Sequence, residues 1–175
     1  YLQRYLHSAG QDLHAQEYYF RKGITYSASG SKGISFRDFP DYALFDIGGS
    51  SIFLSKSITS NSYLMGLLNS KLTFYISDCL NPTVNVQPQD LKRIPFVSPP
   101  EILDSIISNL SETNISIQQN LCSYRIIETN FEQSPLIAFQ GASLKDRVLA
   151  YLNFENAQLT QVLINEAIIN ELIFE

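Results

Sequence analysis

Two histidines near the start of the chain are the first residues whose type and spacing could serve a metal ion. His7 and His14 are seven residues apart with Asp12 between them, so on a helix they would share one face. A metal site needs three or four converging ligands, and the neighbouring sequence supplies no others. We therefore predict ordinary surface or packing histidines and no metal site.

Motifs for nucleophilic catalysis are also missing. No serine occupies a strand–turn–helix elbow, and the two cysteines, Cys79 and Cys122, lie in apolar helical patterns without a histidine partner. Two cysteines are too few for a disulfide framework, so we predict that both are packing residues. Residues 29–33 (SGSKG) lack the GxxxxGK[ST] spacing of a phosphate loop. The sequence thus indicates no independent catalytic site.

The small, polar loop at residues 27–33 (SASGSKG) favours contact with DNA instead. Lys32 lies at its tip, Arg37 follows, and tyrosines surround Arg21 and Lys22 just before it. Serine, lysine and arginine on a loop between strands can donate hydrogen bonds to phosphates and to base edges. The alternative is an ordinary β-hairpin tip with solvated charges, and composition alone does not decide between the two.

The charge distribution limits where DNA could bind. Residues 1–97 hold nine Lys or Arg and seven Asp or Glu, whereas residues 98–175 hold three and ten, for a net charge of −5. The acidic second half would repel phosphates, so we expect any DNA contact before residue 98. Hydrophobic residues make up 45% and charged residues 17%, which allows a buried core.

The elements that position these residues can be predicted from periodicity. Tyr, Phe, Ile and Thr predict strands within 16–27, 33–38 and 41–56, with a bulge at Gly48-Gly49. Apolar residues at spacings of three and four predict one helix over 61–79, with Asn61 or Ser62 as N-cap, and a helical turn follows at 89–92. The fold class is therefore α+β, with a twisted, mainly antiparallel sheet and packed helices.

The second half is predicted to be all-helical. Pro99-Pro100 is the expected boundary, followed by a helix that reaches Leu121, a second helix from Ser143 to Leu152 and a third from about Glu155. No run of 18 apolar residues and no secretory signal occur, and cysteines are few, which predicts a cytoplasmic protein without membrane contact. The start at Tyr1 suggests a piece of a longer chain.

The order of several short motifs resembles one family. Residues 22–53 and 63–96 resemble the target-recognition region of adenine-specific DNA methyltransferases, above all the BREX phage-defence methyltransferase PglX, with weaker likeness to type IIG restriction–modification enzymes and type I specificity subunits. The residues that match the family pattern are Gly23, Tyr26, Ser29, Ser31, Lys32, Phe45, Asp46, Gly49, Ser50, residues 67–71, residues 81–83, Gln87, Asp90, Leu91, Ile94 and Pro95. The helical second half also resembles the family's segment after the recognition domain.

The chain departs from the family in two ways. It has no tryptophan, and it lacks both the glycine-rich cofactor loop and the Asn-Pro-Pro-Tyr-like segment of adenine methyltransferases. The resemblance therefore implies a fragment that does not bind S-adenosylmethionine, which would belong to the catalytic domain of the parent enzyme. That parent would be a site-specific adenine methyltransferase, with fusion to a restriction endonuclease as an alternative.

The resemblance implies a target-recognition domain at 1–98 and a helical spacer at 99–175. Its partners would be double-stranded DNA, the parent methyltransferase domain and other subunits of the defence system. The expected base-reading residues are Tyr26, Ser27, Ser29 and Ser31, and the expected phosphate contacts are Lys32, Arg37, Lys56, Lys71, Lys92 and Arg93. Residues 67–72 and 81–95 should build the scaffold. The alternative function is a protein-interaction module that docks to other components of a defence complex.

Overall fold

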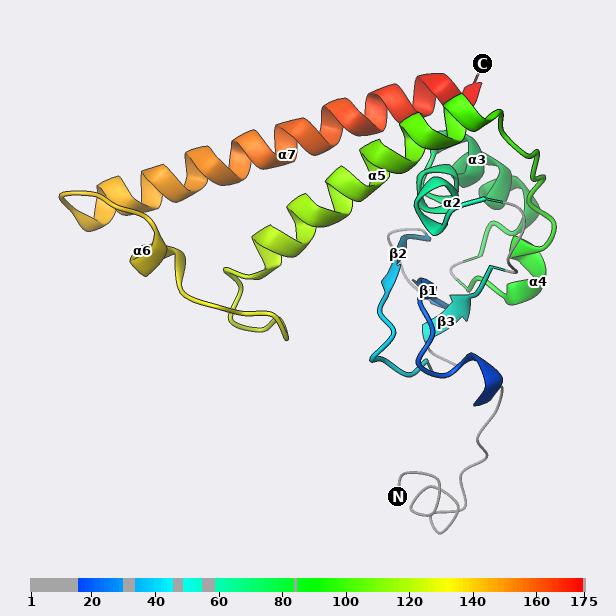
Figure 1. Ribbon diagram of the computed structural model, residues 1–175, viewed down its shortest axis with the longest axis horizontal. Helices are drawn as coiled ribbons and strands as arrows, with labels where there is room; N and C mark the ends of the chain where they lie inside the picture. The colour runs from blue at the N-terminus through cyan, green and yellow to red at the C-terminus, as the bar shows by residue number, and fades with distance from the viewer. Residues whose placement is uncertain (1–15, 30–33, 46–48, 55–58, 84, 175) are drawn as a thin grey trace, which may run out of the picture.

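The computed structural model describes residues 16–29, 34–45, 49–54, 59–83 and 85–174. Figure 1 shows a small sheet covered by short helices, from which two long helices extend as an arm. The elements are η1 (Gln16–Tyr18), β1 (Gly23–Ser27), β2 (Phe36–Phe39), β3 (Gly49–Ile52), α2 (Asn61–Leu68), α3 (Lys71–Leu80), α4 (Pro88–Leu91), α5 (Glu101–Cys122), α6 (Pro135–Ala138) and α7 (Leu144–Phe174). The α+β fold class predicted from the sequence is confirmed.

The three strands form an antiparallel sheet in the order β2-β1-β3. Side chains alternate between its faces, and Ile24 and Tyr26 point to the helical side, where they pack with Phe36, Met65 and Leu68 in the main core. β1 is shorter than predicted, because residues 16–18 form a 3-10 helix. β2 runs over Phe36–Phe39 rather than 33–38, and β3 covers only Gly49–Ile52 of the predicted 41–56. Gly48 lies outside the described residues, so the predicted bulge is not tested.

Phenylalanines and tyrosines cover part of the opposite sheet face. Phe39 and Phe45 both pack against Phe53, with ring centroids 6.1 and 5.5 Å away, and Tyr18 stacks on the same ring at 5.1 Å. These rings lie near the start of β1 and the end of β2. The rest of this face, toward Ser27, carries polar residues.

The segment predicted as one helix over 61–79 forms two. Ser70 ends the first helix by capping the second: its Oγ accepts a hydrogen bond from Thr73 N, and Thr73 Oγ1 donates back to the Leu67 carbonyl at 2.7 Å. The N-cap of α2 is Ser60 rather than Asn61 or Ser62, since Ser60 Oγ accepts from Tyr63 N. Cys79, predicted to be packed, is exposed.

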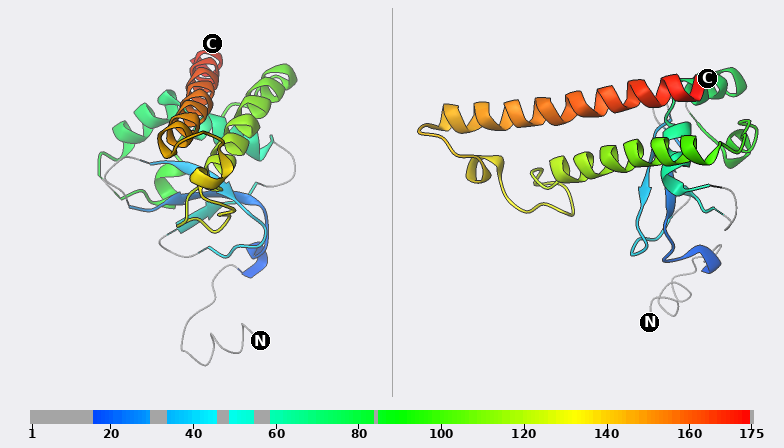
Figure 2. Two further views of the ribbon diagram at one scale, coloured as in Figure 1. Left: turned by 90° about the vertical axis from the view of Figure 1, so that its left-hand side faces the viewer. Right: turned by 45° about the horizontal axis from the view of Figure 1, so that its top comes forward.

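The arm consists of α5 and α7, which run antiparallel and spread apart toward α6 (Figure 2). The helix at 144–174 is continuous, contrary to the predicted pair, because residues 152–155 contain no helix breaker and Phe154 is held between Tyr124 and Phe139. Its start is as predicted: Ser143 and Asp146 form reciprocal capping hydrogen bonds. Neither arm helix, nor any other helix among the described residues, is long and apolar enough to cross a membrane.

The arm is joined to the first half through a shared core. Ile107 of α5 is fully buried and packs with Tyr63 of α2 and Ile169 of α7. Asp104 reinforces this contact by accepting a hydrogen bond from Thr59 at 2.6 Å, and the hydroxyls of Ser60 and Ser108 are hydrogen-bonded to each other, also at 2.6 Å. The division into units at 1–98 and 99–175 stays a prediction, although α5 begins directly after Pro100 as expected.

Candidate nucleic-acid interface

The sheet face that points away from the helices carries the candidate DNA-contacting side chains. Thr25 and Ser27 lie on this face, opposite to Ile24 and Tyr26, because side chains alternate along β1. Arg37 is the cross-strand partner of Thr25 and so lies on the same face. Its Nη2 donates a hydrogen bond to Ser27 Oγ at 2.8 Å, and both residues are exposed. We call Thr25, Ser27 and Arg37 the outer polar face.

Ser29 continues this surface into the hairpin connection. It forms an isolated antiparallel bridge with Asn85, and Val86 N donates to the Ala28 carbonyl at 2.8 Å. Segment 85–86 therefore supports the base of the connection between β1 and β2. Of the other predicted contacts, Ser31, Lys32 and Lys56 lie outside the described residues, as do His7, Asp12 and His14.

A hydrogen-bonded clamp fixes the segment that supports Ser29. Asn81 Nδ2 donates to Asp90 Oδ2 at 2.7 Å and to the Asn85 carbonyl at 2.9 Å. Asp90 Oδ2 also accepts from Gln87 N at 3.0 Å. These hydrogen bonds, first from the Asn81 side chain and then from the Gln87 backbone, lower the pKa of the Asp90 carboxyl. Lys92 and Arg93 follow the clamp directly and are exposed.

A second clamp fixes the edge strand that carries Arg37. Asn69 Oδ1 accepts from Phe36 N at 3.0 Å, and Asn69 Nδ2 donates to the Phe36 carbonyl at 3.1 Å and to the Met65 carbonyl at 3.1 Å. The amide thus binds β2 as a neighbouring strand would and joins it to α2. This agrees with the prediction that segments 67–72 and 81–95 build the scaffold.

Two predicted contact residues are not on the outer polar face. Tyr26 is 1% exposed and packs against Phe36 with ring centroids 5.7 Å apart, and burial raises the pKa of its phenol. It is therefore a core residue here and is not available to read a base; the alternation along β1 could have shown this in advance. Lys71 starts α3 in the helical layer, where its backbone N–H donates to Asn170 Oδ1 at 2.7 Å.

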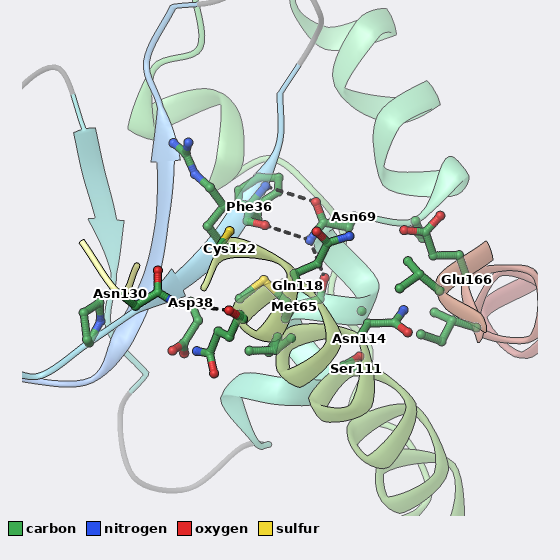
Figure 3. Close-up of a pocket in the computed structure, with 18 of the residues that line it drawn as sticks. Phe36, Asp38, Met65, Asn69, Ser111, Asn114, Gln118, Cys122, Asn130 and Glu166 are labelled. Carbon is green, nitrogen blue, oxygen red and sulfur yellow. Dashed lines mark hydrogen bonds between the residues drawn. The ribbon is translucent and has the colours of Figure 1, made fainter. Parts of the chain in front are cut away.

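Sequence reasoning missed a cleft of about 820 Å³ between β2, α2 and the two arm helices (Figure 3). Its apolar lining includes Phe36 and Met65, and side-chain amides line the α5 wall at Asn114 and Gln118. The available signal was the recurrence of Asn114, Gln118 and Cys122 every four residues, which places them on one helix face. Within the described residues, no cluster of metal-ligating side chains accompanies the cleft.

Comparison with known proteins finds a sequence similarity to part of one enzyme. The chain is 26% identical over 167 residues to the adenine-specific methyltransferase BrxX of Escherichia coli O9:H4 (strain HS). The chain is related to a BREX methyltransferase. The match covers 94% of this chain but only 13% of that protein, so the chain spans a small part of the relative it matches. No protein-family profile matches the chain.

Proposed function

We propose that this chain is the DNA target-recognition module of an adenine-N6 DNA methyltransferase in a BREX-type phage-defence system, without catalytic activity of its own. The observation that carries the proposal is the Arg37–Ser27 pair on the outer polar face. It joins a cation and a hydroxyl on an exposed strand surface, beside the hairpin connection that the family resemblance assigns to DNA. Relatedness to an adenine-specific methyltransferase supports the same function.

The division of labour follows from the chemistry of base methylation. A methyltransferase must rotate its adenine out of the duplex into a catalytic pocket, so the bases around it have to be read by another surface. A read-out surface must present donors and acceptors to base edges while its scaffold stays fixed. Here the Asn69 clamp holds β2 in place, and the Asn81–Asp90 clamp holds the segment that supports Ser29. S-adenosylmethionine would be bound by the catalytic part of the parent enzyme.

The two residues of the pair would act differently. The Arg37 guanidinium has five N–H donors and uses one on Ser27 in this structure, which leaves others for phosphate oxygens or for guanine. The Ser27 and Ser29 hydroxyls can donate to or accept from base edges at short range. Lys92 and Arg93, which follow the Asn81–Asp90 clamp, would add sequence-independent phosphate contacts.

Substitution of the serines tests the proposal. In the full-length parent enzyme, Ser27→Ala and Ser29→Ala should change the methylated motif, because each removes a directional hydrogen bond, and a wrong base pair typically costs about 1–3 kcal/mol. Methylome sequencing of cells that carry each variant reports the motif. Ser98→Ala, an exposed serine distant in sequence from this face, is the matched control. An unchanged motif in both variants would contradict the assignment of Ser27 and Ser29.

A further inference from the structure

The outer edge of β2 forms one wall of the cleft. β2 is an edge strand, and Asn69 already binds the N–H and the carbonyl of Phe36 on that edge. Backbone groups alternate between the two edges of a strand, so the N–H and carbonyl of Asp38 point the same way. Among the described residues, neither group has a backbone partner outside the sheet. The edge of β2 is therefore free to pair with another strand at Asp38, the next outward-facing position after Phe36.

The facing wall of the cleft offers side-chain amides. Asn114 and Gln118 lie on one face of α5, beside Phe36 and Asn69 in Figure 3. Asn114 Oδ1 accepts from Asn165 Nδ2 at 2.7 Å, which leaves its own N–H groups for a ligand. Gln118 is exposed, and within the described part of the chain no hydrogen bond involves its side chain. Primary amides suit peptide groups, as Asn69 demonstrates on Phe36.

The charges around the cleft select the class of ligand. Three carboxylates line it, at Asp38, Glu128 and Glu166, against one guanidinium at Arg37, which is turned to Ser27. This balance repels phosphates and attracts a basic side chain. The volume of about 820 Å³ falls in the range of ligand-binding clefts. The cleft therefore differs in charge from the outer polar face.

We propose that the cleft binds an extended peptide segment of another polypeptide chain, which carries a lysine or arginine and adds as a strand to the free edge of β2. The peptide backbone exchanges hydrogen bonds with Asp38 on one side and with Gln118 and Asn114 on the other. The basic side chain lies among the carboxylates. Arg37 borders both this cleft and the outer polar face, but the proposed peptide contacts do not involve its side chain, so this docking does not depend on DNA reading.

Binding of a designed peptide to the 175-residue chain tests the proposal. The probe is fluorescein-labelled acetyl-Thr-Val-Lys-Val-Thr-amide, and binding is followed by fluorescence anisotropy. We expect saturable binding that is weakened about tenfold or more by N-methylation of both valines or by glutamate in place of lysine. Gln118→Ala should weaken it about two- to tenfold, the range expected for one net hydrogen bond. The matched control is Gln89→Ala, in α4 and away from the cleft.

Several results would overturn the proposal. The absence of binding at millimolar peptide would do so, as would equal binding of the N-methylated or glutamate peptide. Equal affinity of the Gln118→Ala variant would place the peptide elsewhere, provided that its amide spectrum shows a folded chain. Displacement of the peptide by a single-stranded oligonucleotide would make the cleft a nucleic-acid site instead.

Discussion

The crossing of α2 and α5 depends on Gly66, and its replacement by alanine tests the packing that joins the arm to the sheet. A Cβ at this position would lie 2.7 Å from Ser111 Oγ and 2.8 Å from Ile107 Cγ2. Added methyl groups in packed interiors typically cost about 1–3 kcal/mol. Alanine gains about 1 kcal/mol over glycine in a helix interior. We therefore expect Gly66→Ala to destabilise the chain by about 0–2 kcal/mol, rather than to stabilise it as propensity alone predicts.

A double-mutant cycle with Ser111→Ala makes this prediction specific. Ser111 Oγ is buried and has no hydrogen-bond partner among the described residues, so its removal should cost little or stabilise the fold. It also removes the nearer of the two clashes, and Gly66→Ala should then be less destabilising by about 0.5 kcal/mol or more, a typical coupling between touching residues. Urea unfolding of the four proteins measures the cycle, and Ser105→Ala on the exposed face of α5 is the control.

The packing argument would be refuted by either of two results. One is a stabilisation of about 1 kcal/mol by Gly66→Ala in the original chain, which is the propensity gain without a clash. The other is an equal effect of Gly66→Ala with and without Ser111, since the close approach of these two residues demands coupling.

Three further predictions concern the clamps and the cofactor. Asn69→Ala should lower the free energy of unfolding by about 1–3 kcal/mol in urea, because it removes three hydrogen bonds to backbone groups, whereas Asn109→Ala, which removes none of these bonds, should not. The pKa of Asp90 is lowered in the folded state, so the clamp stabilises the fold fully above the ordinary carboxyl pKa of about 3.8. This stabilisation is lost as the pH falls through the lower pKa of the folded state. The difference in unfolding free energy between the chain and Asp90→Asn should therefore shrink between neutral pH and pH 3. Calorimetry with S-adenosylmethionine should show no micromolar binding to the chain, and such binding would contradict its assignment as a recognition module alone.

Local sequence patterns predicted the three strands and the helical character of the first half, because strands and helices follow local rules, but not all of their bounds. The alternation of β1 agrees with the structure, as does the proline at 100, which marks the start of the first helix of the second half. The strand pattern also requires Tyr26 and Ser27, which are consecutive, to point to opposite faces of the sheet. Ser70 and Thr73 can form a helix cap, but serine and threonine also occur within helices. They therefore indicate the break between α2 and α3 less clearly than a proline would.

The parts that could not be predicted depend on tertiary contacts. The continuity of α7 at Phe154 is supported by Tyr124 and Phe139, which are distant in sequence and have no periodic relation to it. The cleft exists because α5 and α7 spread apart beside β2, which no single segment encodes. Asn69 could be recognised as part of a family motif, but its binding to the Phe36 backbone requires the register between α2 and the edge strand.

The salt dependence of DNA binding by an Arg37→Ala variant of the full-length parent tests the central claim most directly. If the outer polar face contacts DNA, affinity should fall, and the slope of log affinity against log salt should become shallower by about one counterion. Arg125→Ala, an exposed arginine in the segment that follows α5, should leave both quantities unchanged. An unchanged affinity and slope for Arg37→Ala, or an equal loss for Arg125→Ala, would contradict the proposal that this sheet face binds DNA.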